Sequence, residues 1–260
     1  MSTDVFDLTG RRALVVGAAE GGLGAQAALA LARRGAEVVV ADLPSRGADL
    51  DATLGRLLAL GRRARALRCD VTREDQAEAA VAHAADPDGR LDILVNAAGM
   101  MLRREVDKTS LDEWRRVLEV NLTGTWLLNR AAGRIMTGRR RGAIVNFSTV
   151  YAERVGPIPE SAYYAAKAGI ANLTRSMAAE FGPYGVTVNC LAPAVFYPTR
   201  MTAPLADDPD RLRWFAERTM LGRLGDPETD LEGPLLLLAS DAGRYMTGQI
   251  VYVDGGWSAW

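Results

Sequence analysis

The sequence predicts an α/β protein whose core is a doubly wound parallel sheet with helices on both faces. Short apolar runs, typical of buried parallel strands, alternate with longer helix-like stretches along almost the whole chain. The first apolar run leads into a glycine-rich loop, and that loop opens the first helical stretch. No linker, internal repeat or low-complexity tract interrupts the alternation, so residues 1–260 are expected to form a single domain.

Seven apolar runs are the expected strands of this Rossmann-type sheet. They comprise residues 13–16, 37–42, 64–69, 91–95, 143–147, 186–191 and 249–253. The helical stretches comprise residues 25–34, 54–60, 76–84, 111–136 and 162–181. The fourth of these is either one long helix or two abutting helices. Ligands of such sheets bind at the carboxyl ends of the strands, so residues that follow each run are candidates for a site.

The glycine-rich loop, residues 17–24, reads GAAEGGLG between the first strand and the first helix. Glycines let the backbone approach a ligand closely, and the amino terminus of a helix carries a partial positive charge. A strand, a glycine loop and a helix start in this order predict a cradle for a pyrophosphate, and with it a dinucleotide cofactor.

Asp42 ends the second strand, where an acidic side chain can accept hydrogen bonds from the adenosine ribose of such a cofactor. Its carboxylate would repel the extra phosphate of NADP, and Glu20 in the glycine loop adds to that repulsion. Arg46, just beyond Asp42, could instead attract the phosphate. The alternative is that Asp42 caps a helix or turn. On balance, the sequence predicts NAD as the cofactor.

Tyr163 and Lys167 are four residues apart in the stretch SAYYAAK, so a helix places them on one face. Pro159, Glu160 and Ser161 are a helix start signal, and Ser161 is the expected cap. A nearby cation favours the ionised form of a phenol, whose unperturbed pKa is about 10. Bringing that pKa to neutrality needs about 4 kcal/mol, which one ammonium and a second cation could supply. The pair therefore predicts a general acid/base.

Composition excludes several other classes of function. A net charge of −1 argues against nucleic acid or an anionic membrane as the main partner. The chain shows neither a secretory pattern nor an apolar run long enough to span a membrane, and Cys69 and Cys190 are expected to be buried free thiols, so a cytoplasmic location is predicted. His83 is the only histidine, which excludes histidine triads and histidine-rich zinc sites. No metal is expected.

Taken together and in this order, the motifs resemble those of the short-chain dehydrogenase/reductase family over almost the whole chain. They are the glycine loop, the turn at residues 96–99, Asn121, the strand end at Ser148 and Thr149, the Tyr163–Lys167 pair, and the turn at Pro193. The resemblance implies an NAD-dependent oxidoreductase that interconverts a secondary alcohol and a ketone by hydride transfer.

The resemblance also implies a role for each matching residue. Tyr163 exchanges the proton, Lys167 lowers its pKa and binds the nicotinamide ribose, and Asn121 holds a water that relays protons to Lys167. The implied catalytic residues are Asn121, Thr149, Tyr163 and Lys167. The implied cofactor contacts are Gly17, Gly22, Leu23 and Gly24 at the pyrophosphate, Asp42 at the adenosine ribose, Asp70 and Val71 at the adenine, and Asn96, Ala98, Gly99, Tyr163, Lys167, Pro193 and Phe196 along the rest of the channel.

The chain departs from the family pattern at two positions that bear on the chemistry. The glycine loop is one residue longer, which leaves open whether Gly21 or Gly22 takes the middle role. Thr149 stands where the family has its catalytic serine, and Ser148 precedes it. Strand alternation predicts that Ser148 points to the opposite face. The alternative is that the segment after Thr149 twists Ser148 into the site.

Arg103 and Arg104 follow the turn at residues 96–99, as a pair of arginines does in the gluconate and deoxygluconate dehydrogenases that the chain resembles. A guanidinium offers a forked donor to a carboxylate, which predicts a sugar acid or polyol as substrate. The alternatives are a solvated loop or a subunit contact for this pair, and a 3-oxoacyl thioester reductase or a non-catalytic NAD-binding relative for the whole chain.

The family resemblance further implies a homotetramer that pairs the helix carrying Asn121 and the helix carrying Tyr163. The apolar tail, residues 257–260, fits a subunit contact, but it could equally pack internally.

Overall fold

Seven parallel strands form one sheet in the computed structural model, which describes residues 4–85 and 87–259. The order in the sheet is β3-β2-β1-β4-β5-β6-β7, and every neighbouring pair is parallel. The strands are β1 (Arg12–Val16), β2 (Glu37–Asp42), β3 (Ala64–Arg68), β4 (Ile93–Asn96), β5 (Gly142–Phe147), β6 (Val186–Pro193) and β7 (Ile250–Val253). The chain winds outward from β1 to β3 and then returns to β4, so the switch point lies between β1 and β4. The predicted fold class is confirmed.

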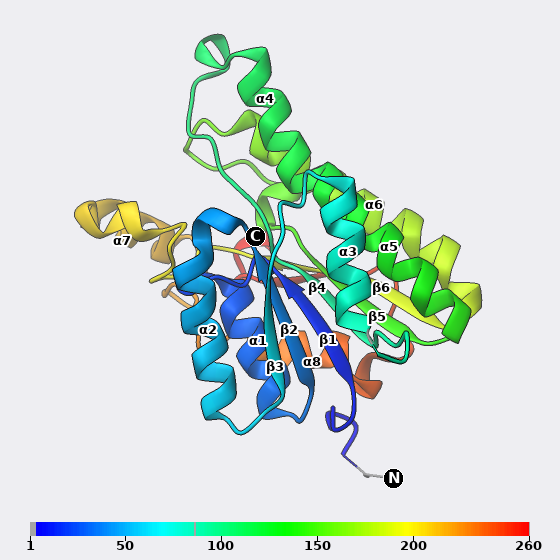
Figure 1. Cartoon of the computed structure of the whole chain (residues 1–260). Helices are drawn as coiled ribbons and strands as arrows, with labels where there is room; N and C mark the ends of the chain where they lie inside the picture. Colours follow the sequence, from blue (N-terminus) through cyan, green and yellow to red (C-terminus); the bar gives the residue numbers. More distant parts are fainter. Residues whose placement is uncertain (1–3, 86, 260) are drawn as a thin grey trace.

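Helices cover both faces of the sheet (Figure 1). One face carries α1 (Leu23–Arg33), α2 (Gly47–Ala59) and α8 (Glu232–Ala239), and the other carries α3 (Glu74–Ala85), α5 (Gly124–Arg139) and α6 (Ser161–Phe181). Two further helices, α4 (Leu111–Leu118) and α7 (Pro209–Glu217), extend beyond the carboxyl ends of the strands. Within the described ranges, no helix combines the length and the apolar character needed to cross a membrane.

Alternate residues of the central strand β1 pack against the two helical layers, which explains why this strand is almost entirely apolar. Ala13 and Val15 of β1 belong to the core beneath α1 and α8, whereas Leu14 and Val16 belong to the core beneath α3 and α5. All four are buried. Because β1 is covered on both faces, it lacks the alternation of apolar and polar residues that half-exposed strands show.

Two elements differ from the expectation, and in a third the structure adopts one of the two alternatives, that of two abutting helices. The helix predicted for residues 54–60 begins at Gly47, because Leu50 and Leu57, seven residues apart, bury one face between charged neighbours. The 111–136 stretch consists of α4 and α5 joined by a π-helical turn, Glu119–Thr123. Ser161 is the first residue of α6 and not its cap; Glu160 holds the cap position, and its side chain makes no capping hydrogen bond.

Trp257 of the apolar tail packs internally. It is buried against Phe215 of α7 and against Tyr151, whose ring centroid is 5.9 Å away in an edge-on geometry. The alternative of internal packing is therefore the correct one for Trp257, whereas Trp260 lies outside the described residues. Cys69 and Cys190 are buried free thiols, as predicted.

Candidate active site

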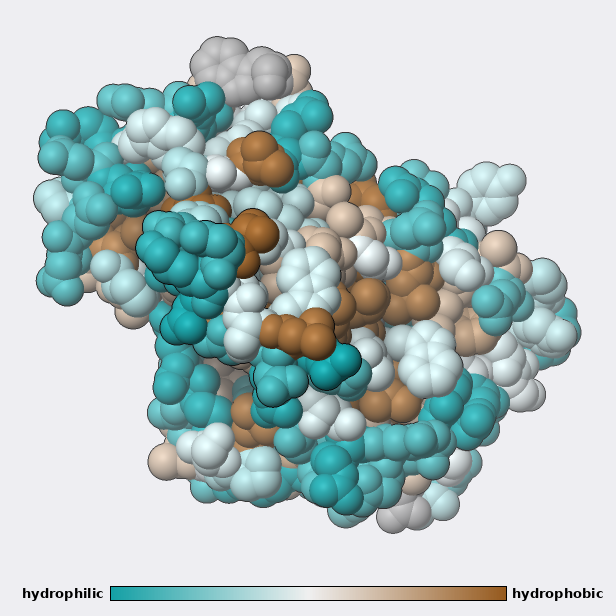
Figure 2. Space-filling view, turned by 90° about the horizontal axis from the view of Figure 1, so that it is seen from above, coloured by the Kyte–Doolittle hydropathy of each residue, from teal (hydrophilic) through white to brown (hydrophobic). Residues whose placement is uncertain are grey.

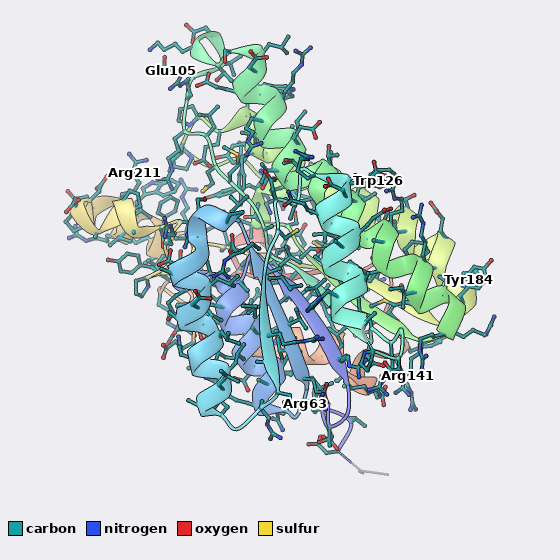
Figure 3. All side chains as sticks on the ribbon, in the orientation of Figure 1. Arg63, Glu105, Trp126, Arg141, Tyr184 and Arg211 are labelled. Atoms are coloured by element: carbon teal, nitrogen blue, oxygen red, sulfur yellow. The ribbon has the colours of Figure 1, made fainter. Side chains whose placement is uncertain are left out.

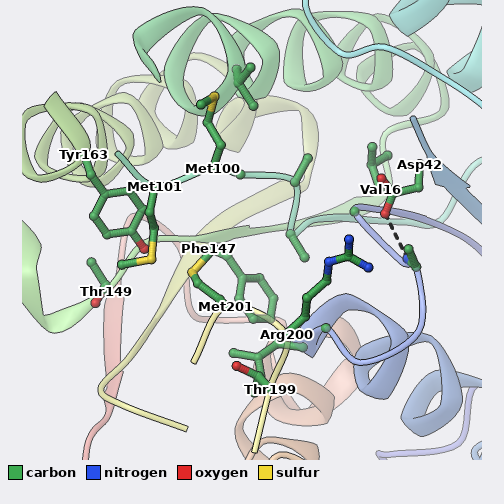
Figure 4. Close-up of a pocket in the computed structure, with 18 of the residues that line it drawn as sticks. Val16, Asp42, Met100, Met101, Phe147, Thr149, Tyr163, Thr199, Arg200 and Met201 are labelled. Carbon is green, nitrogen blue, oxygen red and sulfur yellow. Dashed lines mark hydrogen bonds between the residues drawn. The ribbon is translucent and has the colours of Figure 1, made fainter. Parts of the chain in front are cut away.

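A cavity of about 650 Å³ opens at the carboxyl ends of the strands, beside the switch point of the sheet. Seen from above, this face gathers apolar side chains around its middle and hydrophilic ones around them (Figure 2). The residues predicted from the sequence that line the cavity are Gly17, Gly22, Leu23, Asp42, Asp70, Val71, Ala98, Gly99, Thr149, Tyr163, Lys167, Pro193 and Phe196. The close-up places Asp42 at one end of the cavity and Tyr163 and Thr149 at the other (Figure 4).

Gly22, rather than Gly21, is the middle glycine of the loop that borders the cavity. Gly22 is the N-cap residue of α1, it makes no side-chain capping hydrogen bond, and Gly22 and Leu23 both line the cavity, so the amino terminus of α1 lies at the cavity wall. Gly21 has a φ of +81°, and its carbonyl accepts a hydrogen bond from the N–H of Arg200 at 2.7 Å. The extra residue of the loop is therefore used to contact the segment that follows β6.

Gly24 and Asn96, both expected to line the cofactor channel, are not among the residues that line the cavity. A Cβ atom at Gly24 would lie 2.1 Å from the carbonyl oxygen of Gly17, so this glycine lets α1 pack tightly on the loop. Asn96 is buried, and its Nδ2 donates to the Oδ1 atoms of Asn129 and Asn146 at 2.6 and 2.9 Å. Gly24 and Asn96 are thus packed against other parts of the protein, next to the cavity but not at its surface.

Asp42 lines the cavity and also holds the glycine loop. Its Oδ2 accepts from the N–H of Ala19 at 2.9 Å, and its Oδ1 accepts from the N–H of Leu43 at 2.8 Å. Each carboxylate oxygen has capacity to accept one more hydrogen bond. Arg46 also lines the cavity, but its Nε donates to Asp49 at 2.8 Å.

Asn121 lies behind Gly99 and does not line the cavity. It is fully buried in the π-helical turn, and its Nδ2 donates to the carbonyls of Met100 and Val117 at 2.9 Å each. A Cβ atom at Gly99 would lie 2.7 Å from the Asn121 Oδ1 and 3.6 Å from the Lys167 Nζ. The absence of a side chain at Gly99 therefore lets the amide approach the ammonium group.

Tyr163, and not Tyr164, faces the cavity. Tyr163 is buried and lines its wall, whereas the Tyr164 hydroxyl donates to the carbonyl of Ile158 at 3.0 Å. The Lys167 Nζ donates to the carbonyl of Phe147 at 2.8 Å and lies 5.5 Å from the centre of the Tyr163 ring. The helix register inferred from the spacing of Tyr163 and Lys167 is thus the one that the fold adopts.

The expected lowering of the Tyr163 pKa is not found in this structure. Burial raises the pKa of Tyr163, the charge of Glu160 and the neighbouring Tyr164 raise it further, and only Arg103 opposes them. Burial also lowers the pKa of Lys167 to about 8. The reason is geometric: the ammonium hydrogen bonds to a backbone carbonyl and faces the ring of Tyr163, so desolvation outweighs its pull on the phenol.

Ser148 and Thr149 both border the cavity. The Ser148 hydroxyl nevertheless donates to the carbonyl of Lys167 at 2.8 Å, which joins the end of β5 to α6. The Thr149 hydroxyl donates to the carbonyl of Pro193 at 3.0 Å, across the mouth between β5 and β6. Thr149 shares its end of the cavity with Tyr163 (Figure 4).

The two arginines singled out from the sequence have separate environments. Arg103 lines the cavity, and its Nε donates to the carboxylate of Glu160 at 3.0 Å. Arg104 pairs with Glu113 of α4 at 2.7 Å and is not among the cavity residues. Three methionines that the sequence did not single out complete this end of the cavity: Met100, Met101 and Met201.

The groups around the cavity fit a dinucleotide. From one end to the other, they offer a carboxylate acceptor at Asp42, the free N–H groups at the start of α1, and the Lys167 ammonium beside Gly99. In this order, the three groups match the hydroxyls of one ribose, a pyrophosphate and the hydroxyls of a second ribose. No group of three or more metal-ligating side chains occurs within residues 4–85 and 87–259.

Comparison with known proteins places this site in a family. Residues 17–258 match a family model described as enoyl-(acyl carrier protein) reductase. The chain is 42% identical over 251 residues to a cis-4-hydroxycyclohexanecarboxylate dehydrogenase of Sinomonas cyclohexanicum, covering 96% of this chain and 97% of the relative. It is 38% identical over 256 residues to a gluconate 5-dehydrogenase of Gluconobacter oxydans, covering 97% and 96%.

A solved structure agrees with these relatives. The gluconate 5-dehydrogenase of Burkholderia cenocepacia, in complex with NADP and tartrate, superposes with a TM-score of 0.91 at 34% identity and covers 99% of this chain and 98% of its own. The fold, the motif order and these comparisons agree. The chain therefore belongs to the short-chain dehydrogenase/reductase family and is an oxidoreductase that acts on CH–OH groups with a nicotinamide cofactor.

Proposed function

We propose that this protein is an NAD-dependent dehydrogenase that interconverts a secondary alcohol and a ketone on a small sugar acid or polyol, with Tyr163 as the acid/base. One observation carries the proposal: Tyr163, Lys167 and Arg103 line the same cavity that Asp42 borders at its far end. A proton-exchanging group, a donor for a carboxylate and an acceptor for ribose hydroxyls are thereby held around one space.

The side chains divide the chemistry among themselves. The nicotinamide ring, when bound, accepts or returns the hydride of the carbinol carbon. The Tyr163 hydroxyl exchanges the proton of the substrate oxygen. Rotation about its Cα–Cβ bond moves the Thr149 hydroxyl from the Pro193 carbonyl to that oxygen, where it steadies the developing charge. Lys167, held at the Phe147 carbonyl, has two remaining N–H groups for a ribose.

Arg103 supports a substrate that carries a carboxylate. Its Nη1 atom has no hydrogen-bond partner within the described ranges, and the side chain is 32% exposed at the cavity. A carboxylate can therefore reach the guanidinium without first displacing a protein group. Gluconate and 5-ketogluconate are the substrates in the names of several relatives, and tartrate is bound in the Burkholderia structure.

A dehydrogenase screen with NAD and NADP in parallel tests the proposal. Its substrates are gluconate, 2-deoxygluconate, tartrate, the corresponding polyols and simple secondary alcohols. We expect NAD reduction with at least one sugar acid or polyol. Binding of NAD without turnover of any of them would indicate a non-catalytic relative.

A 3-oxoacyl thioester reductase is the second candidate, because the matching family model is described as a reductase of acyl-carrier-protein substrates. It predicts oxidation of NADPH by acetoacetyl thioesters. The Asp42 carboxylate in the same cavity weighs against it, since it would repel the extra phosphate of NADPH, whereas Arg46 pairs with Asp49 only through its Nε.

Replacing Arg103 with glutamine should lower kcat/KM for a sugar acid by about 10- to 100-fold, since a hydrogen bond to a charged group contributes roughly 1.5–3 kcal/mol. The value for the matching neutral polyol should change little. Arg104→Gln is the matched control, because Arg104 pairs with Glu113 away from the cavity. Equal losses on the acid and the polyol would contradict a role in carboxylate binding.

Replacing Asp42 with alanine should shift the ratio of kcat/KM for NAD over NADP toward NADP by at least about 10-fold, equivalent to 1.4 kcal/mol. The change removes both a ribose acceptor and a charge that repels the extra phosphate. Asp51→Ala is the control, because Asp51 is a carboxylate of α2 that pairs with Arg68 and does not line the cavity. A preference of the unmodified protein for NADPH would overturn the NAD assignment and point to Arg46.

A homotetramer that pairs the helices carrying Asn121 and Tyr163 belongs to the same proposal, as does a cytoplasmic location, in keeping with two free cysteines. Exposed apolar side chains support subunit pairing: Trp126 of α5 is 39% exposed, and Val106 and Leu111 lie exposed near the start of α4. Trp126 points outward from its helix (Figure 3). Light scattering of the purified protein tests the assembly.

A further inference from the structure

A buried carboxylate lies at the substrate end of the cavity, outside the machinery described above. Glu160 precedes α6, and only 1% of its side chain is exposed. Its Oε1 accepts from the Arg103 Nε at 3.0 Å. A charge so deeply buried is costly unless it is paired, and Arg103 is the partner that the structure provides.

The backbone holds the two residues in place. The N–H of Arg104 donates to the carbonyl of Pro159 at 2.8 Å, which joins the loop after β4 to the turn before α6. The Arg103 Nη2 then donates to the carbonyl of Met201 at 3.3 Å. The Arg103 guanidinium is thus fixed through its Nε and Nη2, while its Nη1 has no hydrogen-bond partner among the described residues.

We propose that Glu160 is a positioning and specificity-determining residue, which orients Arg103 toward the substrate and offsets its charge. With the pair formed, this end of the cavity carries no net charge from these two groups, while Arg103 still offers its Nη1 hydrogens. Such a site accepts a neutral hydroxyl or a single carboxylate and disfavours a dianion, such as a sugar phosphate. The proposal deepens the proposed function but does not depend on which alcohol the protein oxidises.

Glu160 also acts on the acid/base residue. The charged or titratable groups that face Tyr163 are Glu160 before α6, Arg103 after β4, Tyr164 and Lys167 on α6, and Tyr151 after β5. The charge of Glu160 raises the pKa of Tyr163, and that of Arg103 lowers it. Removing the Glu160 charge should therefore favour the phenolate that alcohol oxidation requires.

Glu160→Gln separates charge from position, because the amide oxygen of glutamine can still accept from Arg103. We expect the KM or Kd for anions to fall by about 5-fold or more, with no change for the matching polyol. We also expect the alkaline rise of oxidation to move to lower pH. Glu160→Ala removes both the charge and the acceptor that holds Arg103 in place. This variant should therefore not show the gain in anion binding expected of Glu160→Gln.

Two further variants show whether Glu160 acts through Arg103. Glu113→Gln is the matched control, since it neutralises the partner of Arg104 and should leave both anion binding and the pH profile unchanged. In an Arg103→Gln background, Glu160→Gln should give no gain in anion binding, whereas the shift of the pH profile should persist. Thermal unfolding of each variant checks that the fold is retained.

The probes are tartrate, gluconate, glucitol and glucose 6-phosphate, with binding measured on the NADH complex and turnover measured with NAD. Equal effects of Glu160→Gln on anions and glucitol would overturn the proposal, as would an absence of anion binding in both the unmodified protein and the variant. If the unmodified protein uses only neutral alcohols, the sugar-acid part of the proposed function fails. The role of Glu160 is still supported in that case if the Glu160→Gln variant binds the anions that the unmodified protein does not bind.

Discussion

Tyr163→Phe should lower kcat by about 10²- to 10⁴-fold, which is the usual contribution of a positioned general acid or base. The phenyl ring keeps the packing of a buried side chain and loses only the hydroxyl that exchanges the proton. The Kd for NAD, measured by calorimetry, should change by no more than about 3-fold, because Asp42 and the start of α1 lie at the other end of the cavity.

Tyr164→Phe is the matched control for this experiment. Its hydroxyl donates to the carbonyl of Ile158, so the variant should lose about 1 kcal/mol of unfolding free energy and keep most of its activity. An inactive Tyr164→Phe beside an active Tyr163→Phe would mean that α6 presents its other tyrosine to the substrate.

The pH profile adds a second measurement on the same residue. Because burial raises the pKa of Tyr163, alcohol oxidation, which needs the phenolate, should rise with pH on the alkaline side of neutrality. Ketone reduction, which needs the protonated phenol, should fall as the pH rises. In Tyr163→Phe, this dependence should be absent from any residual activity.

Thr149→Val should lower kcat by about 10²- to 10³-fold, the typical cost of removing one donor from an oxygen that gains charge in the transition state. Valine keeps the branched shape and cannot donate. The variant also leaves the carbonyl of Pro193 without its present donor, at a cost of about 1–3 kcal/mol in stability. Activity should therefore be compared at a temperature where thermal unfolding shows both proteins fully folded.

The neighbouring serine distinguishes catalysis from support. Ser148 donates to the backbone of α6 at Lys167, so Ser148→Ala should reduce stability modestly and activity only a few-fold. Thr149→Ser should remain active and accept bulkier alcohols, because a methyl group leaves the cavity. Near-normal turnover of Thr149→Val together with a collapse of Ser148→Ala would assign the catalytic hydroxyl to Ser148.

Local patterns in the sequence were sufficient to predict the fold class and to predict that Tyr163 and Lys167 share one face of a helix. Short apolar runs without polar alternation, such as residues 13–16, are typical of strands covered on both faces, and helix spacing alone places Tyr163 and Lys167 on one face. The glycine loop follows from the same reasoning, since a strand and a helix bracket it. These features depend on neighbours within a few residues, which is why they can be read without the fold.

Tertiary structure decided what depends on contacts between distant segments. The sequence could not show that Gly22 rather than Gly21 borders the cavity, because that follows from the contact of Gly21 with Arg200. It predicted a lowered pKa for Tyr163, but the sign of the shift depends on burial and on Glu160, which only the packed site reveals.

The arginine pair shows the same division. From the sequence, Arg103 and Arg104 are equivalent neighbours that follow one turn, and Glu160 reads only as part of a helix start. In the fold, one arginine enters the cavity beside the buried Glu160, and the other pairs with Glu113 on α4. The sequence by itself determined the fold class and the helix register that places Tyr163 and Lys167 on one face. Which charges gather at this end of the cavity was decided by the packing of segments more than fifty residues apart, because charges act through space and not along the chain.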